Sequence, residues 1–137
     1  MSDMPPKRRR FGHVPPTEPR LIEGVRLFNA GKFFESHEVW ESLWHEVGGK
    51  ERGLLQGLIQ LAAAYHHLSR KNYTGAHYLY AKGRAHLAPW VPEHAGIAIG
   101  ELLAQMAEDL AQVARGKQPA CTPQLALESQ SNRRRPR

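Results

Sequence analysis

Residues 50–70, KERGLLQGLIQLAAAYHHLSR, decide the fold because they predict one long helix that is apolar around most of its circumference. Large apolar side chains recur along it at helical spacing, at Leu54, Leu58, Leu61, Tyr65 and Leu68. A second stripe, of small residues, consists of Gly53, Gly57 and Ala64. A helix of this kind is buried on several sides, and its glycines allow another helix to approach closely. We therefore expect this segment to be the central helix of an all-α bundle.

Helical periodicity also runs through the sequence on either side of that segment, and no stretch alternates with the period of two that is typical of strands. We expect a first helix that begins with Thr17 as N-cap and ends at Gly31. Further helices are expected over residues 32–47, 73–88 and 94–115. The predicted fold is a compact bundle of about five helices, built from packed antiparallel helical hairpins.

The two ends of the chain differ from the rest in composition and charge. Residues 1–16 and 117–137 show little periodicity, so we predict two disordered basic tails around a bundle domain of residues 17–116. Residues 1–20 and 116–137 hold ten Lys or Arg and three Asp or Glu, whereas the rest of the chain holds nine and ten. The net charge of +6 therefore belongs to the tails, and a nucleic acid would be bound only through them, without sequence preference. The expected phosphate contacts are Arg8, Arg9, Arg10, Arg133, Arg134 and Arg135.

The composition also limits the compartment and the partners. Cys121 is the single cysteine, so no intrachain disulfide forms. No apolar run approaches the roughly 20 residues that a membrane helix requires. The basic N-terminus lacks the apolar stretch that follows such residues in a signal peptide. We expect a soluble cytoplasmic protein that has no membrane partner.

The segment 34–46, FESHEVWESLWHE, places ionisable residues among aromatic ones within the predicted helix 32–47. On a helical wheel one face collects Phe33, Trp40, Leu43, Trp44 and Val47. His37 falls inside this apolar face, and Glu41, one turn later, lies at its edge and is able to reach it. With Glu38 nearby, these residues form a candidate polar site. Its expected aromatic rim consists of Phe34, Trp40 and Trp44.

Two glutamines, Gln56 and Gln60, lie on one line of the predicted central helix. Such a polar line must find hydrogen-bond partners or stay open to solvent, because an unsatisfied buried polar group costs about 1–3 kcal/mol. A hairpin of the two helices is expected to bring the glutamines opposite the three polar residues of the helix 32–47. His77 is the candidate that the next helix would add to this cluster.

Three interpretations of this cluster stay open. In the first it is a buried polar network, in which Glu41 holds His37 and the glutamines complete the hydrogen bonds. In the second it is a small-molecule or catalytic pocket, with Glu41 or Glu38 as general base and His37 as its partner. In the third, His37 and Glu41 hold a metal ion, although the third ligand is missing from the pattern. His66 and His67 point about 100° apart on a helix and so cannot serve one ion.

Three segments occur in an order that resembles a known family. Phe34 precedes a His-Glu-x-x-Glu-x-x-Trp run, a Gln-Gly-Leu-Ile-Gln run follows at residues 56–60, and Gly75-Ala76 comes next. This order is similar to that of the small bacterial and archaeal family called domain of unknown function 309. The resemblance implies a compact all-helical bundle, and it suggests no activity because the family has none agreed. The polar signature of the family corresponds here to His37, Glu38, Glu41, Gln56 and Gln60.

The sequence thus predicts a small helical-bundle protein whose His/Glu/Gln cluster is either a structural network or a small-ligand pocket. A protein-interaction module of helical hairpins and a metal-binding bundle are the alternatives. An enzymatic activity is neither indicated nor excluded, and no cofactor is identified. The expected partner is a protein or a small molecule of unknown identity.

Overall fold

The computed structural model describes residues 14–116, which form five α-helices and one short 3-10 helix. They are α1 (Pro19–Asn29), α2 (Phe33–Trp44), α3 (Glu51–Ser69), α4 (Tyr73–Leu87), η1 (Ala88–Trp90) and α5 (Ile99–Ala114). The predicted all-α class is confirmed, since these residues contain no strand beyond one isolated bridge. In this part of the chain no helix combines the length and the apolarity needed to cross a membrane. The two predicted tails, with their arginines, lie outside the described residues except for positions 14–16.

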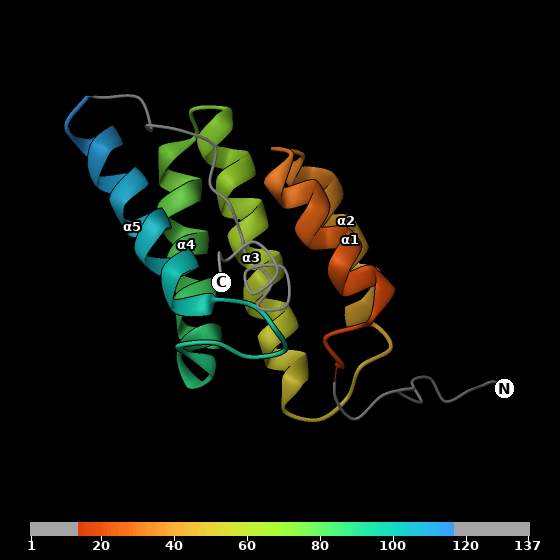
Figure 1. Ribbon diagram of the computed structural model, residues 1–137. Helices are drawn as coiled ribbons and strands as arrows, with labels where there is room; N and C mark the ends of the chain where they lie inside the picture. The colour runs from red at the N-terminus through yellow and green to blue at the C-terminus, as the bar shows by residue number, and fades with distance from the viewer. Residues whose placement is uncertain (1–13, 117–137) are drawn as a thin grey trace, which may run out of the picture.

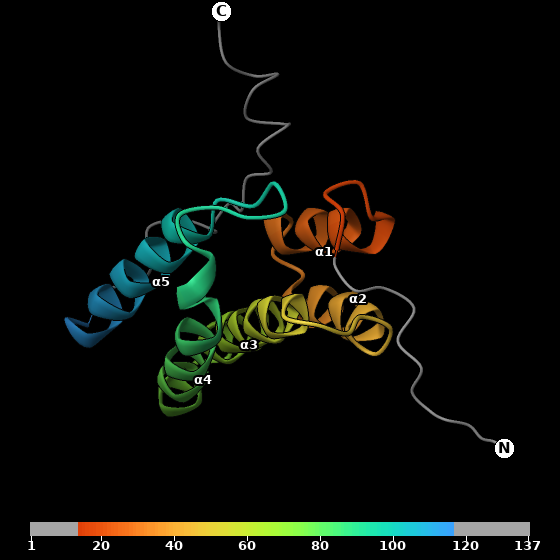
Figure 2. The same cartoon turned by 90° about the horizontal axis from the view of Figure 1, so that it is seen from below.

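Two layers of helices make up the bundle. Figure 2 shows α2, α3 and α4 side by side in one layer, with α1 and α5 in the other. The helices that pack most extensively are α3 with α4, α2 with α3, and α1 with α2. Each of these pairs is joined by a short connection (Figure 1). Helix α3 thus lies in the middle of its layer, as its apolar circumference predicts, and its outer side faces away from α1 and α5.

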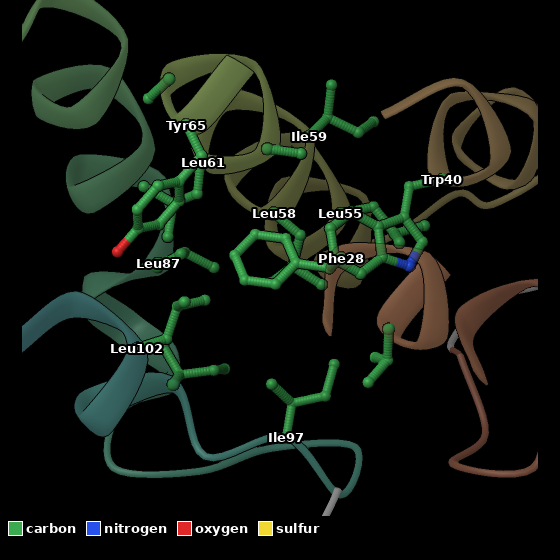
Figure 3. Close-up of a cluster of buried hydrophobic side chains, with 14 of the residues drawn as sticks. Phe28, Trp40, Leu55, Leu58, Ile59, Leu61, Tyr65, Leu87, Ile97 and Leu102 are labelled. Atoms are coloured by element: carbon green, nitrogen blue, oxygen red, sulfur yellow. The ribbon is translucent and has the colours of Figure 1, made fainter. Parts of the chain in front are cut away.

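Aromatic rings fill the space between the layers around Phe28 of α1 (Figure 3). The ring centroids of Phe33, Tyr65 and Trp40 lie 5.1, 5.5 and 6.1 Å from that of Phe28. The planes of Phe28 and Tyr65 meet at 87°, the edge-to-face arrangement that aromatic pairs prefer. The predicted apolar stripe of α3 is buried in full, at Leu54, Leu58, Leu61, Tyr65 and Leu68. Because Phe28 contacts rings of α2 and α3 at once, it ties the two layers together.

The contact between α3 and α4 requires a glycine at position 57. A Cβ atom placed on Gly57 would lie 2.5 Å from Leu87 Cγ and 3.1 Å from the Gly83 carbonyl oxygen. On Gly53 it would meet nothing within 4 Å. The predicted close approach is therefore confirmed at Gly57 and wrong at Gly53. The reason is that α4 ends at Leu87, beside Gly57, and does not extend to the first turn of α3.

Helix α5 begins at Ile99 and not at the predicted His94, because a tight turn occupies residues 94–97. The N–H of His94 donates to the Ile97 carbonyl oxygen at 3.1 Å, and the N–H of Ile97 donates to the His94 carbonyl oxygen at 2.8 Å. Between them Ala95 and Gly96 have φ values of 53° and 79°. Two successive positive φ values are typical of a type I′ turn, and alanine rarely adopts one. Gly96 was therefore the residue of this turn from which the turn could have been predicted.

Glu51, in the first turn of α3, fastens two segments that are far apart in the sequence. Its carboxylate accepts a hydrogen bond from the backbone N–H of Val14 and contacts Nε2 of His94. The ring of His94 lies over Trp90, with the centroids 4.5 Å apart. Val14 is 2% exposed, so the packed part of the chain begins before residue 17, where we placed the start of the domain.

A buried polar group ties α5 to α3. Asp109 is 1% exposed, and its Oδ2 accepts a hydrogen bond from the Tyr65 hydroxyl at 2.7 Å. Its Oδ1 accepts a second one from Nε2 of Gln105 at 3.0 Å. The apolar stripe predicts the burial of Tyr65 but not this partner. The burial of Asp109 could have been predicted from its spacing, because it lies on the same face of α5 as the buried Leu102 and Met106.

Gly57→Ala is expected to lower the free energy of unfolding by about 1–3 kcal/mol, because the added Cβ collides with Leu87 and Gly83. Gly53→Ala, in the same helix, is the matched control. It meets no neighbour and improves helix propensity, so we expect it to stabilise the fold by up to about 1 kcal/mol. Urea unfolding followed by circular dichroism measures both variants. Equal effects would contradict the close contact between α3 and α4.

Tyr65→Phe leaves Oδ2 of Asp109 buried without its donor and is expected to lower the free energy of unfolding by about 1–3 kcal/mol. Tyr78, which is 62% exposed, provides the control. Tyr78→Phe removes the same atom from the surface and is expected to change stability by less than about 0.5 kcal/mol. Thermal unfolding compares the two variants, and similar melting temperatures would show that the buried hydrogen bond does not stabilise the fold.

Candidate functional site

A cavity of about 250 Å³ lies where α2 meets the C-terminal half of α3. Helix α2 contributes Phe34 and His37 to its wall, and α3 contributes Ala63, His66 and His67. Phe34 is 49% exposed, so an aromatic ring borders the cavity on the side of the solvent. Three imidazoles and one phenyl ring therefore surround a space that the fold leaves open.

The rotation of α2 about its own axis decides which of its side chains reach α3. Ser36 is fully buried, and its hydroxyl donates to the Gly24 carbonyl oxygen of α1 at 2.8 Å. Trp40, one turn later, is fully buried as well. His37 follows Ser36 by about 100° around the helix and is only half-buried. It thus lies at the edge of the apolar face and not inside it, because Ser36 occupies the centre of that face.

One nitrogen of His37 is left without a partner. Its Nδ1 has no access to solvent and makes no hydrogen bond with any residue of the described range 14–116. The Phe34 ring is stacked on the imidazole, with the centroids 5.7 Å apart and the planes at 21°. The predicted buried network placed Glu41 in contact with this histidine. Among the described residues no hydrogen bond joins the two, so the network lacks its central contact.

His66 lies on the opposite wall, with its ring centroid 5.5 Å from that of Phe34. Burial lowers the pKa of His66 below its ordinary value of 6.5. The positive charge of Arg70 and the neighbouring His67 lower this pKa further, and Glu35 opposes them. The His66 ring is therefore uncharged at neutral pH.

The position of the proton on His67 follows from the N-cap of α4. Oδ1 of Asn72 accepts a hydrogen bond from the N–H of Gly75 at 3.1 Å, which fixes the orientation of the amide. The NH₂ group of Asn72 then lies 3.0 Å from Nδ1 of His67 and donates to it. Because Nδ1 accepts, the neutral His67 ring carries its proton on Nε2. The cavity wall thus includes a ring nitrogen that is set as a hydrogen-bond donor.

The glutamines do not join the histidine of α2. Gln60 is buried, and its Oε1 lies 2.8 Å from Nδ1 of His86 on α4. His86 of α4, and not the predicted His77, is thus the histidine that contacts this glutamine, and both histidines are exposed. Gln56 is half-buried and does not line the cavity. The predicted meeting of the two glutamines with His37 is therefore wrong, because Gln60 faces α4 and not α2.

The two glutamates and the predicted aromatic rim are also dispersed. Glu38 is exposed and Glu41 is half-buried, and neither lines the cavity. Trp40 belongs to the core, where its Nε1–H donates to the Leu21 carbonyl oxygen at 3.2 Å. Trp44 lies under the guanidinium of Arg52, which is 3.5 Å from the ring centroid. Of the three rim residues only Phe34 borders the cavity.

Metal ligands do not converge in the described part of the chain. Residues 14–116 contain no group of three or more His, Cys, Asp or Glu side chains placed to hold a metal ion. The candidates His37 and Glu41 thus find no third ligand there. The three imidazoles of the cavity are close enough to share one small molecule, but they are not arranged as the ligands of one ion.

Ala63, His66 and His67 were not predicted as site residues. Their signal was present, because the two histidines occur in the last turns of α3 and α2 packs on that helix. The angle of about 100° between adjacent helical residues argues against a shared ion. It does not argue against a cavity, whose wall takes residues from more than one direction.

Comparison with family models finds that residues 21–79 match the domain of unknown function DUF309. The resemblance seen in the sequence is thereby confirmed over these residues. The matched stretch contains all five residues that line the cavity, and it ends before His86 and α5. The description of the family assigns no activity. A comparison with curated proteins finds no match.

The lowered pKa of His66 predicts how stability depends on pH. The unfolded chain protonates His66 at a higher pH than the folded chain, so stability falls as the pH decreases through 6.5. His66→Gln is expected to flatten this part of the profile. Urea unfolding at a series of pH values measures the slopes, and an unchanged slope in His66→Gln would contradict the shift.

Proposed function

We propose that this protein binds a small molecule in the cavity between α2 and α3. The observation that carries the proposal is the cavity itself, whose wall brings together the imidazoles of His37, His66 and His67 and the ring of Phe34. A small ligand in this space can stack on an aromatic ring and form hydrogen bonds with accessible imidazole nitrogens.

The size of the cavity limits the ligand. An engineered apolar cavity of about 150 Å³ holds benzene. The cavity here measures about 250 Å³, which leaves space for a ring and a small polar group. Sites for drug-sized ligands span roughly 300–1,000 Å³. The volume therefore favours a monocyclic or similarly small ligand and argues against a dinucleotide.

The chemistry of the wall supports recognition by both stacking and hydrogen bonds. Phe34 offers an aromatic face, and its ring already lies near those of His37 and His66. The imidazoles can donate or accept, depending on where their protons lie. Glu38 and Glu41, the predicted general bases, do not line the cavity. We therefore propose binding and assign no reaction.

The alternative of a protein-interaction module has no comparable support. Within residues 14–116 the large exposed apolar residues come from α1, α2, α4 and the segment after η1, and they are Ile22, Phe34, Tyr73, Tyr78 and Val91. Interaction sites are marked by contiguous apolar patches. Residues that are distributed over four elements do not favour one such patch.

Ala63→Leu tests the proposal because the added side chain fills the cavity from α3. The probes are benzoate, benzamide and benzylamine, and binding is followed through the ring resonances of His37, His66 and His67 in ¹⁵N–¹H spectra. We expect at least one probe to shift these resonances in a saturable manner, and its dissociation constant to rise about tenfold or more in Ala63→Leu. Ala104→Leu, the same substitution at an exposed position of α5, is expected to change nothing.

Two results would refute a binding function for the cavity. One is that none of the three probes perturbs the histidine rings of the wild-type protein. The other is that Ala63→Leu, with a native circular dichroism spectrum, binds the probes as well as Ala104→Leu does.

A further inference from the structure

The geometry points to a small planar carboxylate as the ligand of the cavity, an inference that rests on the proposed binding function. Four features of the described residues support it. They are the charges around the cavity, the hydrogen-bond donors on its wall, the helix ends beside it, and its aromatic face.

The charges around the cavity favour an anion. Among the described residues the ionisable groups of its wall are three histidines, and no carboxylate of residues 14–116 lines it. Arg70, at the end of α3, acts on His66 with a positive charge, and Glu35 is the acidic residue that opposes it. Glu35 is exposed, so its charge is screened by solvent. An anion within the cavity thus meets cationic or neutral groups, whereas a cation would meet no counter-charge on the wall.

The wall presents hydrogen-bond donors to such an anion. The contact with Asn72 sets the proton of His67 on Nε2, so this ring is a donor and not an acceptor at its free nitrogen. The neutral His66 ring also carries one N–H, whereas Nδ1 of His37 has no access to solvent and is not reached from the cavity. A carboxylate has only acceptor atoms and can receive one hydrogen bond on each oxygen.

The helix ends beside the cavity add to this preference. Phe34 belongs to the first turn of α2, and Lys32 at the N-cap position provides no side-chain hydrogen bond to that turn. The partial positive charge of this N-terminus attracts anions. The C-terminus of α3 has the opposite sign, but its last carbonyl groups already have donors. Those of His66 and His67 accept from the N–H of Arg70, at 3.2 and 3.1 Å.

The aromatic face accounts for the planar part of the ligand. The Phe34 ring centroid lies 5.7 Å from that of His37 and 5.5 Å from that of His66. Phe34 is half exposed, so a flat apolar group that enters beside it removes further ring surface from water. A simple inorganic anion would use the donors but leave this surface exposed.

Benzoate, benzamide and benzylamine separate charge from shape, because the three molecules share a ring and differ in the charge of one substituent. Titrations of the full-length protein, with chelator present, follow the ring resonances of His37, His66 and His67. We expect benzoate to bind about tenfold more tightly than benzamide, because hydrogen bonds to a charged group are stronger than those to a neutral one. We expect benzylamine to bind most weakly. Benzoate is also expected to raise the pKa of His66, since a nearby negative charge favours the protonated ring.

Asn72→Ser tests the donor on His67 without removing the N-cap of α4. Serine caps a helix about as well as asparagine, but its side chain is too short to hold Nδ1 of the histidine. We expect the melting temperature to stay close to that of the wild type while the preference for benzoate over benzamide decreases several-fold. An equal loss of both probes would mean that Asn72 acts only on the structure, and this would overturn the assignment of His67 as a donor.

The remaining outcomes distinguish the two proposals. If benzamide or benzylamine binds as tightly as benzoate, the cavity is a binding site but its ligand is not an anion. If none of the probes shifts the histidine rings, the binding function itself fails, and this inference fails with it.

Discussion

The packing of α1 against α2 through Gly24 is the constraint on which the position of the cavity depends. Gly24 lies against the indole of Trp40 so closely that a Cβ atom would have no space. The Gly24 carbonyl oxygen accepts the hydroxyl of Ser36, and the indole N–H donates to the Leu21 carbonyl oxygen at 3.2 Å. Two side chains of α2, one turn apart, are thus held by the backbone of α1. These two contacts set the rotation of α2 and so determine which of its residues face α3.

Most of the fold could be predicted from hydrophobic periodicity, because the elements are long helices with clear apolar faces. The central role of α3 follows from its leucines, and the end of α1 from Gly31, whose φ is 80°. The start of α5 could not be predicted, since the type I′ turn before it places Ala95 at a positive φ. Nor does a sequence show where a partner helix ends, and for this reason we predicted a close helix contact at Gly53 as well as at Gly57.

The candidate site was predicted only in part, and the reason is geometric. A helical wheel gives the direction of a side chain only relative to its own helix. The prediction misplaced the centre of the apolar face of α2 by a small angle, and it therefore assigned His37 to the interior of that face and not to its edge. The wheel also says nothing about distant partners, and the contact of Gln60 with His86 joins residues 26 positions apart in the sequence. The two histidines of α3 form part of a cavity wall only because α2 packs across them, and the sequence of α3 alone does not show this.

The stretch that matches the family, residues 21–79, is shorter than the unit that packs together. Among the residues that the structure describes, six large core residues follow it, namely Leu87, Ile97, Ile99, Leu102, Met106 and Leu110. Tyr65 lies within the stretch, whereas its acceptor Asp109 lies beyond it. A fragment that ended with the match would leave one face of α3 in water and a phenol without its acceptor. The segment by which the family is recognised is therefore shorter than the packed unit of which it is a part.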